Sequence, residues 1–416
     1  MAFNKYLLGQ TLNGLGRDPN PIVALPTNAT RGWNDYTFGI GDPRSGNYRP
    51  DCDISNPLAN GECAQINNLA FGASTLPSTN PGVPGPDLFD KDLISGFNNR
   101  QANWEFSTSV QHELMPGMAL DVGYFRRAWA HFRVTDNLLV SPQDFTRFDI
   151  VAPSNPNLPG GGGYTIHGFY DVVPGKFGQV RNLNALSDKY GDQFENWNGV
   201  DVTVNSRLKN GVTLQAGLST GKTMEDNCDI VDKLPEMNFF PTGIPPAVLG
   251  GTLPASWRAA EWCHRESPFL TQFKAYGVYI VPKIEVQVAG SFRNLPGQIG
   301  PPALPPNNDV QVALAATNAY LATNSTLGRA LSGGAANVSL QLLEPYTEYL
   351  DRRNELDLRF GKIIRFSGQR AVVSVDVYNA LNSNARIMVN QSYAAYPRPT
   401  EILNARLVKF SVNYDF

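Results

Sequence analysis

The chain contains pairs of long alternating segments that are joined by very short turns. The clearest pair flanks Lys209-Asn210-Gly211, where apolar and polar residues alternate on both sides of the turn. The apolar members are Val200, Val202, Val204 and Leu208 before the turn, and Val212, Leu214, Ala216 and Leu218 after it. Because successive side chains of a β-strand point to opposite faces, this period predicts a hairpin with one apolar face and one polar face.

Three further turns, Met115-Pro116-Gly117, Pro282-Lys283 and Ser367-Gly368-Gln369, join segments of the same kind. Each places turn-forming residues between two alternating runs. The pattern predicts about ten strands, at residues 3–11, 103–115, 118–134, 197–208, 212–224, 268–281, 284–295, 354–366, 370–383 and 404–416. The predicted fold class is therefore all-β and antiparallel.

Segment length separates a soluble sandwich from a membrane barrel. The segments run about 11 to 15 residues, whereas typical strands have about 5 to 6 and a tilted strand crosses a bilayer in about 9 to 11. The connections are very short at one end and long at the other, at about 12–102, 135–196, 225–267 and 296–353. Outer-membrane barrels have short periplasmic turns and long extracellular loops, so a partial antiparallel transmembrane β-barrel is favoured over a soluble sandwich.

The overall composition argues against other classes of protein. The 416-residue chain has a net charge of -3, which provides no broad basic surface for nucleic acid. It has no run of about 18 apolar residues, so no transmembrane helix is expected. The mean hydropathy of -0.26 does not oppose a membrane barrel, because alternating strands average to a polar value.

The alternation continues to the last residue of the chain. Every second position is apolar, at Val408, Phe410, Val412, Tyr414 and Phe416. A terminal Phe that follows such a run resembles the signal by which the barrel-assembly machinery recognises outer-membrane proteins. The last strand is therefore expected to run toward the periplasm.

Several other segments resemble a known family. They include WEFS at 104–107, VQHEL at 110–114, DVGYFRR at 121–127, LDLRFGK at 356–362 and DVYNALN at 376–382. Together they resemble the barrel half of TonB-dependent receptors that carry an N-terminal carboxypeptidase-regulatory-like domain. The resemblance extends from about Arg31 to Phe416.

This resemblance implies a transporter of the bacterial outer membrane and not an enzyme. Such receptors have a barrel of about 22 strands with a plugged lumen, and TonB energises the uptake of a large or scarce solute. The sequence shows neither a plug nor a signal peptide, so residues 1–416 are expected to be the C-terminal part of such a barrel. The expected partners are outer-membrane lipid, the barrel-assembly machinery, TonB through a missing N-terminal plug region, and an unknown solute. Aromatic and acidic residues in loops 134–197, 224–267 and 294–353 would contact that solute first.

The four cysteines fall into two local pairs, Cys52 with Cys63 and Cys228 with Cys263. Local pairing predicts two disulfides and an oxidising compartment. Cys228 follows one predicted strand and Cys263 precedes the next, so their bond would close the base of a long loop. Closing a loop of about 35 residues stabilises a fold by roughly 3 to 4 kcal/mol.

Asp35, Asp51 and Asp53 lie in a polar segment together with Asn34 and Asn47. Carboxylate and amide oxygens are the ligands that Ca²⁺ prefers, so the three aspartates are a candidate metal site. Their spacing is not that of an EF-hand, and a solvated acidic loop is the simpler interpretation. No other cofactor is expected.

Two further segments carry recognisable patterns. Residues 216–223, AGLSTGKT, resemble a phosphate-binding loop, but Gln215 and Ser219 keep a half-polar alternation that a buried parallel strand would not have. This alternation argues against a nucleotide site. Residues 309–322 are a candidate for a short helix within a loop.

Two alternatives to a receptor remain: an extracellular soluble β-structured binding or adhesion module, and a passive porin. Carbonate washing of membranes tests the first. We expect the protein to stay with the membrane fraction and to need detergent for release, because lipid covers the apolar face of a membrane barrel. Recovery in the aqueous fraction without detergent would exclude a role in membrane transport.

Overall fold

One antiparallel sheet organises the protein. The computed structural model describes residues 1–7, 28–69, 71–72, 90–94, 96–208, 211–239, 257–297, 309–366 and 368–415. Within them, ten strands lie side by side in the order β1-β2-β3-β8-β9-β11-β12-β15-β16-β19. Their bounds are β1 Ala2–Leu7, β2 Ala102–Met115, β3 Met118–Ala130, β8 Phe194–Arg207, β9 Val212–Asp226, β11 Gln272–Val281, β12 Val286–Gly297, β15 Leu350–Phe366, β16 Gln369–Tyr378 and β19 Leu407–Asp415. A short strand, β10 (His264–Glu266), also pairs with β9.

The all-β antiparallel fold is confirmed, and each predicted strand has a counterpart in this sheet. Residues 8–11 of the first predicted strand, and parts of the turns at 209–210 and 367, lie outside the described residues. Long segments with strict alternation were predictable because register is fixed when the two faces of a strand differ.

Some predicted boundaries were wrong. The turn after β11 takes four residues, 282–285, and two of them, Lys283 and Glu285, have positive φ angles of 71° and 49°. Ile284 therefore lies in the turn and not in a strand. The predicted strand 118–134 is interrupted at His131, which has a φ of 60°, and a separate strand, β4 (Arg133–Asn137), follows it.

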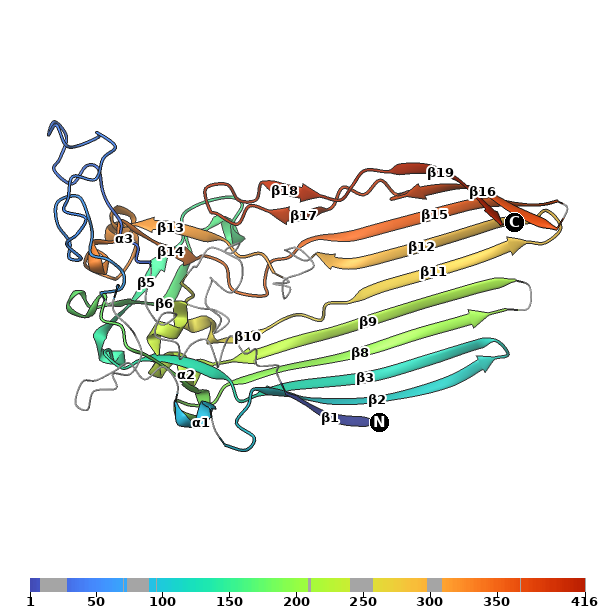
Figure 1. The fold of residues 1–416 in the computed structure, drawn as a ribbon, viewed down its shortest axis with the longest axis horizontal. Coiled ribbons are helices and arrows are strands. Elements are labelled where there is room, and N and C mark those ends of the chain that lie inside the picture. The colour runs from blue at the N-terminus through green and yellow to red at the C-terminus, as the bar shows by residue number, and fades with distance from the viewer. Residues whose placement is uncertain are drawn as a thin grey trace.

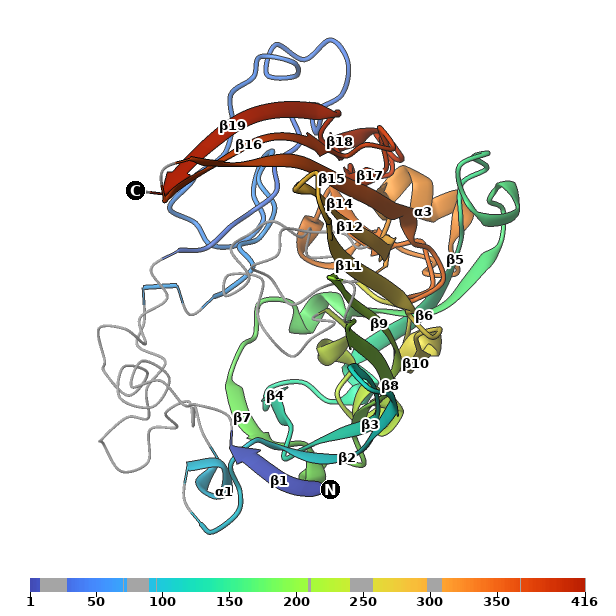
Figure 2. The same cartoon turned by 90° about the vertical axis from the view of Figure 1, so that its right-hand side faces the viewer.

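The sheet is bent into an arc and is not closed by the described strands. Figure 2 shows β1 and β19 at the two ends of this arc. Among the described residues, β1 pairs only with β2, and β19 pairs only with β16. Both edges of the sheet therefore present unpaired backbone groups in the part of the chain that the structure describes.

The long connections gather at one end of the sheet and the short turns at the other (Figure 1). The connections contain four two-stranded sheets, which pair β4 with β7, β5 with β6, β13 with β14, and β17 with β18. The new strands are β5 Phe145–Val151, β6 Thr165–Val172, β7 Asn182–Leu186, β13 Ala313–Thr317, β14 Asn337–Gln341, β17 Arg386–Val389 and β18 Pro399–Ile402. We call the described parts of 131–193, 227–271, 309–349 and 379–406 the loop layer.

Helices are few and short. The α-helices are α1 Lys91–Ile94, α2 Cys228–Lys233 and α3 Asn318–Asn324, and the 3-10 helices are η2 Pro142–Asp144, η3 Pro159–Gly161, η4 Pro174–Lys176, η5 Ser187–Lys189, η6 Pro235–Phe239, η7 Ala260–Cys263 and η8 Ser332–Gly334. The helix predicted at 309–322 is wrong in its first half, where 313–317 forms strand β13. Thr317 caps α3 by accepting a hydrogen bond from the backbone N–H of Tyr320 at 3.2 Å, so the helix begins only after this residue.

The main apolar core lies in the loop layer and not against the large sheet. Strands β5, β6, β13 and β14 and helix α3 bury side chains together, and the rings of Phe148 and Phe169 are 5.8 Å apart. The core includes Phe148, Ile150, Ile166, Phe169, Leu321, Leu340, Leu342 and Leu343. These connections were predicted as long loops, and they fold into a layer with its own apolar core.

We expect the substitution Phe169→Ala to destabilise the loop layer by about 3 to 5 kcal/mol, because it leaves a cavity in a packed core. Hydrogen exchange should show faster exchange of β5, β6 and β13 amides with little change in β8 and β9. The fully exposed Ile40 supplies the control Ile40→Ala, which should leave both regions unchanged. Equal exchange in wild type and Phe169→Ala would contradict an independent core.

Candidate functional site

The large sheet carries one continuous apolar face. Strand register places Val122 opposite Val202, Val202 opposite Leu218, and Leu218 opposite Phe273. Phe273 is opposite Asn294, and the same face is apolar again at the next pairs, where Phe292 is opposite Leu356 in β15. In β16 and β19, Val375 pairs with Phe410. Aromatic rings meet across strands on this face, as in the stacked pair of Phe3 and Trp104 with centroids 5.1 Å apart.

This apolar face is open to its surroundings. The side chains of Val110 and Phe410 are 70% and 77% exposed. Within the described residues, the four other sheets are two-stranded and belong to the loop layer, so no second sheet packs against the face. A soluble sandwich would bury these rows between two sheets.

The opposite face carries charged residues in ion pairs. Arg293 bonds Glu355 at 2.6 Å, and Arg359 bonds Asp376 at 3.0 Å. Glu355 and Asp376 are each only 6% exposed. The two carboxylates are therefore buried, whereas the side chains of Arg293 and Arg359 are 44% and 43% exposed. A water-soluble protein would bury the apolar rows of the other face, which are exposed here.

Both predicted disulfides are present. The bond between Cys228 and Cys263 joins the start of α2 to the end of η7, with a Cα–Cα distance of 4.8 Å. Beside it, β10 pairs with β9, and His264 Nδ1 lies 2.8 Å from Asp226 Oδ2. This disulfide therefore closes the base of a long connection immediately above the sheet.

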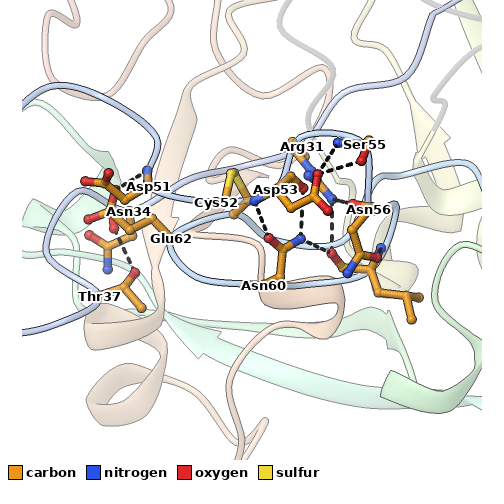
Figure 3. The surroundings of a disulfide bond; sticks show 12 residues. Arg31, Asn34, Thr37, Asp51, Cys52, Asp53, Ser55, Asn56, Asn60 and Glu62 are labelled. Carbon is orange, nitrogen blue, oxygen red and sulfur yellow. Dashed lines mark hydrogen bonds between the residues drawn. A yellow bond between two sulfur atoms is a disulfide. The ribbon is translucent and has the colours of Figure 1, made fainter. Parts of the chain in front are cut away.

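The bond between Cys52 and Cys63 holds the segment 28–69, with a Cα–Cα distance of 5.8 Å. Its neighbours form a local hydrogen-bond network (Figure 3): Glu62 Oε2 accepts from the backbone N–H of Asp51 at 2.9 Å, and Asn60 Oδ1 accepts from that of Asp53 at 2.7 Å. The segment contacts the loop layer where Gln65 donates to the carbonyl oxygen of Phe177 at 2.8 Å.

The structure does not bring Asp35, Asp51 and Asp53 into a common site. Figure 3 shows Asp51 and Asp53 on either side of the disulfide. The Asp53 carboxylate accepts from the backbone and hydroxyl of Ser55 at 2.9 and 2.6 Å, and these bonds lower its pKa. Asp35 instead accepts from the N–H of Tyr48 at 2.9 Å. In the part of the chain that the structure describes, no group of three His, Cys, Asp or Glu residues is placed to hold a metal.

The other motifs lie in strands. Residues 216–223 lie within β9, where all of them pair with β8 and 216–219 also pair with β11, so this segment is extended strand and not a loop that could surround a phosphate. Val408, Phe410, Val412 and Tyr414 lie on the exposed apolar face of β19, and Phe416 lies outside the described residues. In the described residues, no helix is long and apolar enough to cross a membrane.

A buried ionic cluster ties the loop layer to the sheet. Arg265 of β10 forms an ion pair with Glu225 of β9, and the Tyr346 hydroxyl donates to Glu225 at 2.5 Å. The backbone N–H of Tyr346 donates to Asp309 at 2.8 Å. Arg258 is buried beside them, and desolvation lowers its pKa to about 9. Because buried charges need fixed partners, this cluster fixes 309 and 346 relative to β9.

A pocket of about 450 Å³ lies where three connections of the loop layer meet. It is lined by Pro159, Tyr164, Thr165, Ile166, Glu261, Trp262, Leu343, Glu344, Thr347 and Glu348. These residues come from the β5–β6 hairpin, from η7 and from the segment after β14. They belong to the three loops that the sequence indicated as the first contact for a solute, although no local motif identified the individual residues.

The pocket combines an apolar base with acidic groups. Ile166, Trp262 and Leu343 are buried. The Tyr164 hydroxyl donates to the carbonyl oxygen of Leu342 at 2.9 Å, and burial raises the pKa of Tyr164 to about 12, so this phenol is neutral at pH 7. The remaining polar groups are three glutamates and two threonines.

Comparison with known proteins adds little. No family model and no curated protein matches the chain. Among solved structures, a complex of Pseudomonas aeruginosa FpvA with a heterologous pyoverdine has a TM-score of 0.37 and 12% identity, over 76% of this chain and 27% of that chain. The FpvAI–pyocin S2 complex has a TM-score of 0.37 and 12% identity, over 76% of this chain and 28% of that chain. The outer membrane transporter YddB from Escherichia coli has a TM-score of 0.36 and 8% identity, over 75% of this chain and 32% of that chain. The chain spans about a third or less of these proteins, and scores at this level decide neither fold nor function.

One partly buried carboxyl is expected to make the stability of the loop layer depend on pH. Glu236 lies in η6, and its Oε1 accepts the backbone N–H of Asn137 in β4 at 3.1 Å. Desolvation is the main cause that raises the pKa of Glu236 to about 7; the charge of Asp136 acts in the same direction, and the hydrogen bond from Asn137 acts against it. The folded loop layer therefore favours the protonated carboxyl.

The pKa of Glu236 in the folded protein lies above 4.5, the ordinary value for a glutamate, which also applies to the unfolded chain. The stability contributed by Glu236 is therefore present below about pH 4.5 and is lost as pH rises toward 7. We expect the loss to be on the order of 3 kcal/mol. Thermal unfolding of the loop layer between pH 4.5 and 8 should show this slope, and Glu236→Gln should flatten it. If the stability of Glu236→Gln depends on pH as strongly as that of wild type, another group causes the pH dependence.

Proposed function

We propose that this chain forms part of an outer-membrane receptor barrel that takes up a large or scarce solute with energy from TonB. The single observation that carries the proposal is the exposed apolar face of the large sheet, which lies opposite a face of ion pairs with buried carboxylates. In lipid the exposed rows are covered by acyl chains, and the charged face lines an enclosed aqueous space.

Strand length also supports a sheet that spans the outer membrane. Strands β2, β8, β9 and β15 have 14, 14, 15 and 17 residues, which exceeds the roughly 9 to 11 residues that a tilted strand needs to cross a bilayer. Short turns would face the periplasm, and the loop layer would face the outside. The resemblance of the sequence to TonB-dependent receptors supports this orientation.

The proposal must also account for the two open edges of the sheet, at β1 and β19. Unpaired N–H and C=O groups are costly in hydrocarbon, so a membrane sheet must close on itself. We propose that further strands pair with β1 and β19 and complete the barrel, and that a plug domain gates its lumen. Under this proposal TonB acts through the plug and the barrel-assembly machinery inserts the strands.

The loop layer would capture the solute. It has its own core, a disulfide at its base and a buried ionic cluster that joins it to β9. These features hold the surface of the pocket in one geometry, which lowers the entropy cost of binding. We propose a binding and transport role for this surface and no catalysis.

A matched pair of arginine substitutions tests the proposal. Val202 and Thr203 are neighbours at the middle of β8 on opposite faces. In lipid, Val202→Arg should cost about 2 to 4 kcal/mol and Thr203→Arg much less, because only the first side chain meets acyl chains. The measurement is the fraction of each variant that is membrane-inserted and resistant to carbonate.

Two results would contradict the proposal. If both variants insert as well as wild type, the apolar face does not meet lipid. If all three proteins remain aqueous, the soluble binding or adhesion module is the better interpretation. A passive porin predicts the same arginine result but no in-phase plug-encoding sequence upstream, so the upstream reading frame separates it from a receptor.

A further inference from the structure

We propose that the pocket in the loop layer binds a compact organic cation, one that carries amine or guanidinium groups on a short apolar frame. The proposal rests on the proposed function for its biological meaning, because it names the class of solute that the receptor would capture. The binding chemistry itself follows from the shape, charge and lining of the pocket.

The shape of the pocket is built by separate, fixed segments. Trp262 is 7% exposed and precedes Cys263, which is held in the disulfide to Cys228. Ile166 and Leu343 belong to the main core of the loop layer, and each is 1% exposed. A volume of about 450 Å³ lies in the range of small-molecule sites, roughly 300 to 1,000 Å³.

The charge of the pocket has one sign. Glu261, Glu344 and Glu348 are among its lining residues, which include no Lys, Arg or His. None of the three carboxylates forms an ion pair among the described residues. One oxygen of Glu261 accepts the backbone N–H of His167 at 2.8 Å, which orients this carboxylate. Like charges that line one concave surface focus the field and favour a cation.

The aromatic lining favours an organic cation over a hydrated metal ion. Tyr164 and Trp262 line the pocket, and a cation over the face of such a ring is stabilised by about 0.5 to 2 kcal/mol. The Tyr164 hydroxyl already donates to Leu342, so it offers an acceptor to a ligand N–H. A divalent metal needs several oxygens at one point, and in the described residues the three glutamates are not so placed.

Isothermal titration of the full chain in detergent with spermidine tests the inference. We expect binding to wild type and at least a 10-fold loss of affinity in the double variant Glu344→Gln/Glu348→Gln. Neither of these side chains has a hydrogen bond that the fold needs: only their backbone oxygens accept, from Thr347 and Val310. The variant should therefore keep its thermal stability.

The matched control is Glu113→Gln/Glu401→Gln, which removes the same charge from exposed residues of β2 and β18. It should bind spermidine as wild type does. A third variant, Thr165→Trp, fills the pocket without changing its charge and should also lose at least 10-fold. Citrate serves as an anion of similar size and should not bind.

Any of three results would overturn the inference: no binding to wild type, an equal loss in the control, or unchanged binding in Thr165→Trp. Tighter competition by Ca²⁺ than by spermidine would overturn the choice of an organic cation. Membrane insertion is measured separately on the same proteins, so absence of spermidine binding to a wild type that inserts normally rejects only this inference. Failure of wild type to insert, with spermidine bound normally, rejects only the proposed function.

Discussion

A wide apolar surface that faces outward must be covered by something other than water, and most features of this protein relate to that constraint. Each square ångström of apolar surface left in water costs about 25 cal/mol relative to burial, and the apolar face runs across ten strands. Side chains such as Val110 and Phe410 gain nothing from the protein itself, since they are largely exposed. Lipid is a solvent in which such an arrangement is stable.

The same constraint explains where the dry core lies. One face of the sheet is apolar and exposed, and the other carries ion pairs such as Arg293 with Glu355. Neither face of the sheet therefore packs into an apolar core. The residues that pack as in a soluble domain are in the connections, around Phe169 and Leu342. The Cys228–Cys263 disulfide closes the base of one connection in this second layer, and the Arg265–Glu225 pair fastens the layer to β9.

The proposed receptor function divides between these two layers. The sheet would supply a spanning wall and an aqueous lining, and the loop layer would supply recognition. The pocket at the junction of three connections has the fixed walls that selective binding requires. Its three glutamates lie outside the apolar core, and under the proposed function they would serve recognition of the solute.

Local sequence was enough to predict the large sheet, because alternation along β8 and β9 fixes both the faces and the register of a strand. The spacing of the cysteines likewise predicted both disulfides. Three other features depend on tertiary packing: the connections fold around Phe169, Asp35, Asp51 and Asp53 stay apart, and Glu261, Glu344 and Glu348 line one pocket. The physical reason is range, since alternation is a property of neighbours along the chain, whereas the pocket joins residues brought together by packing from segments almost two hundred positions apart.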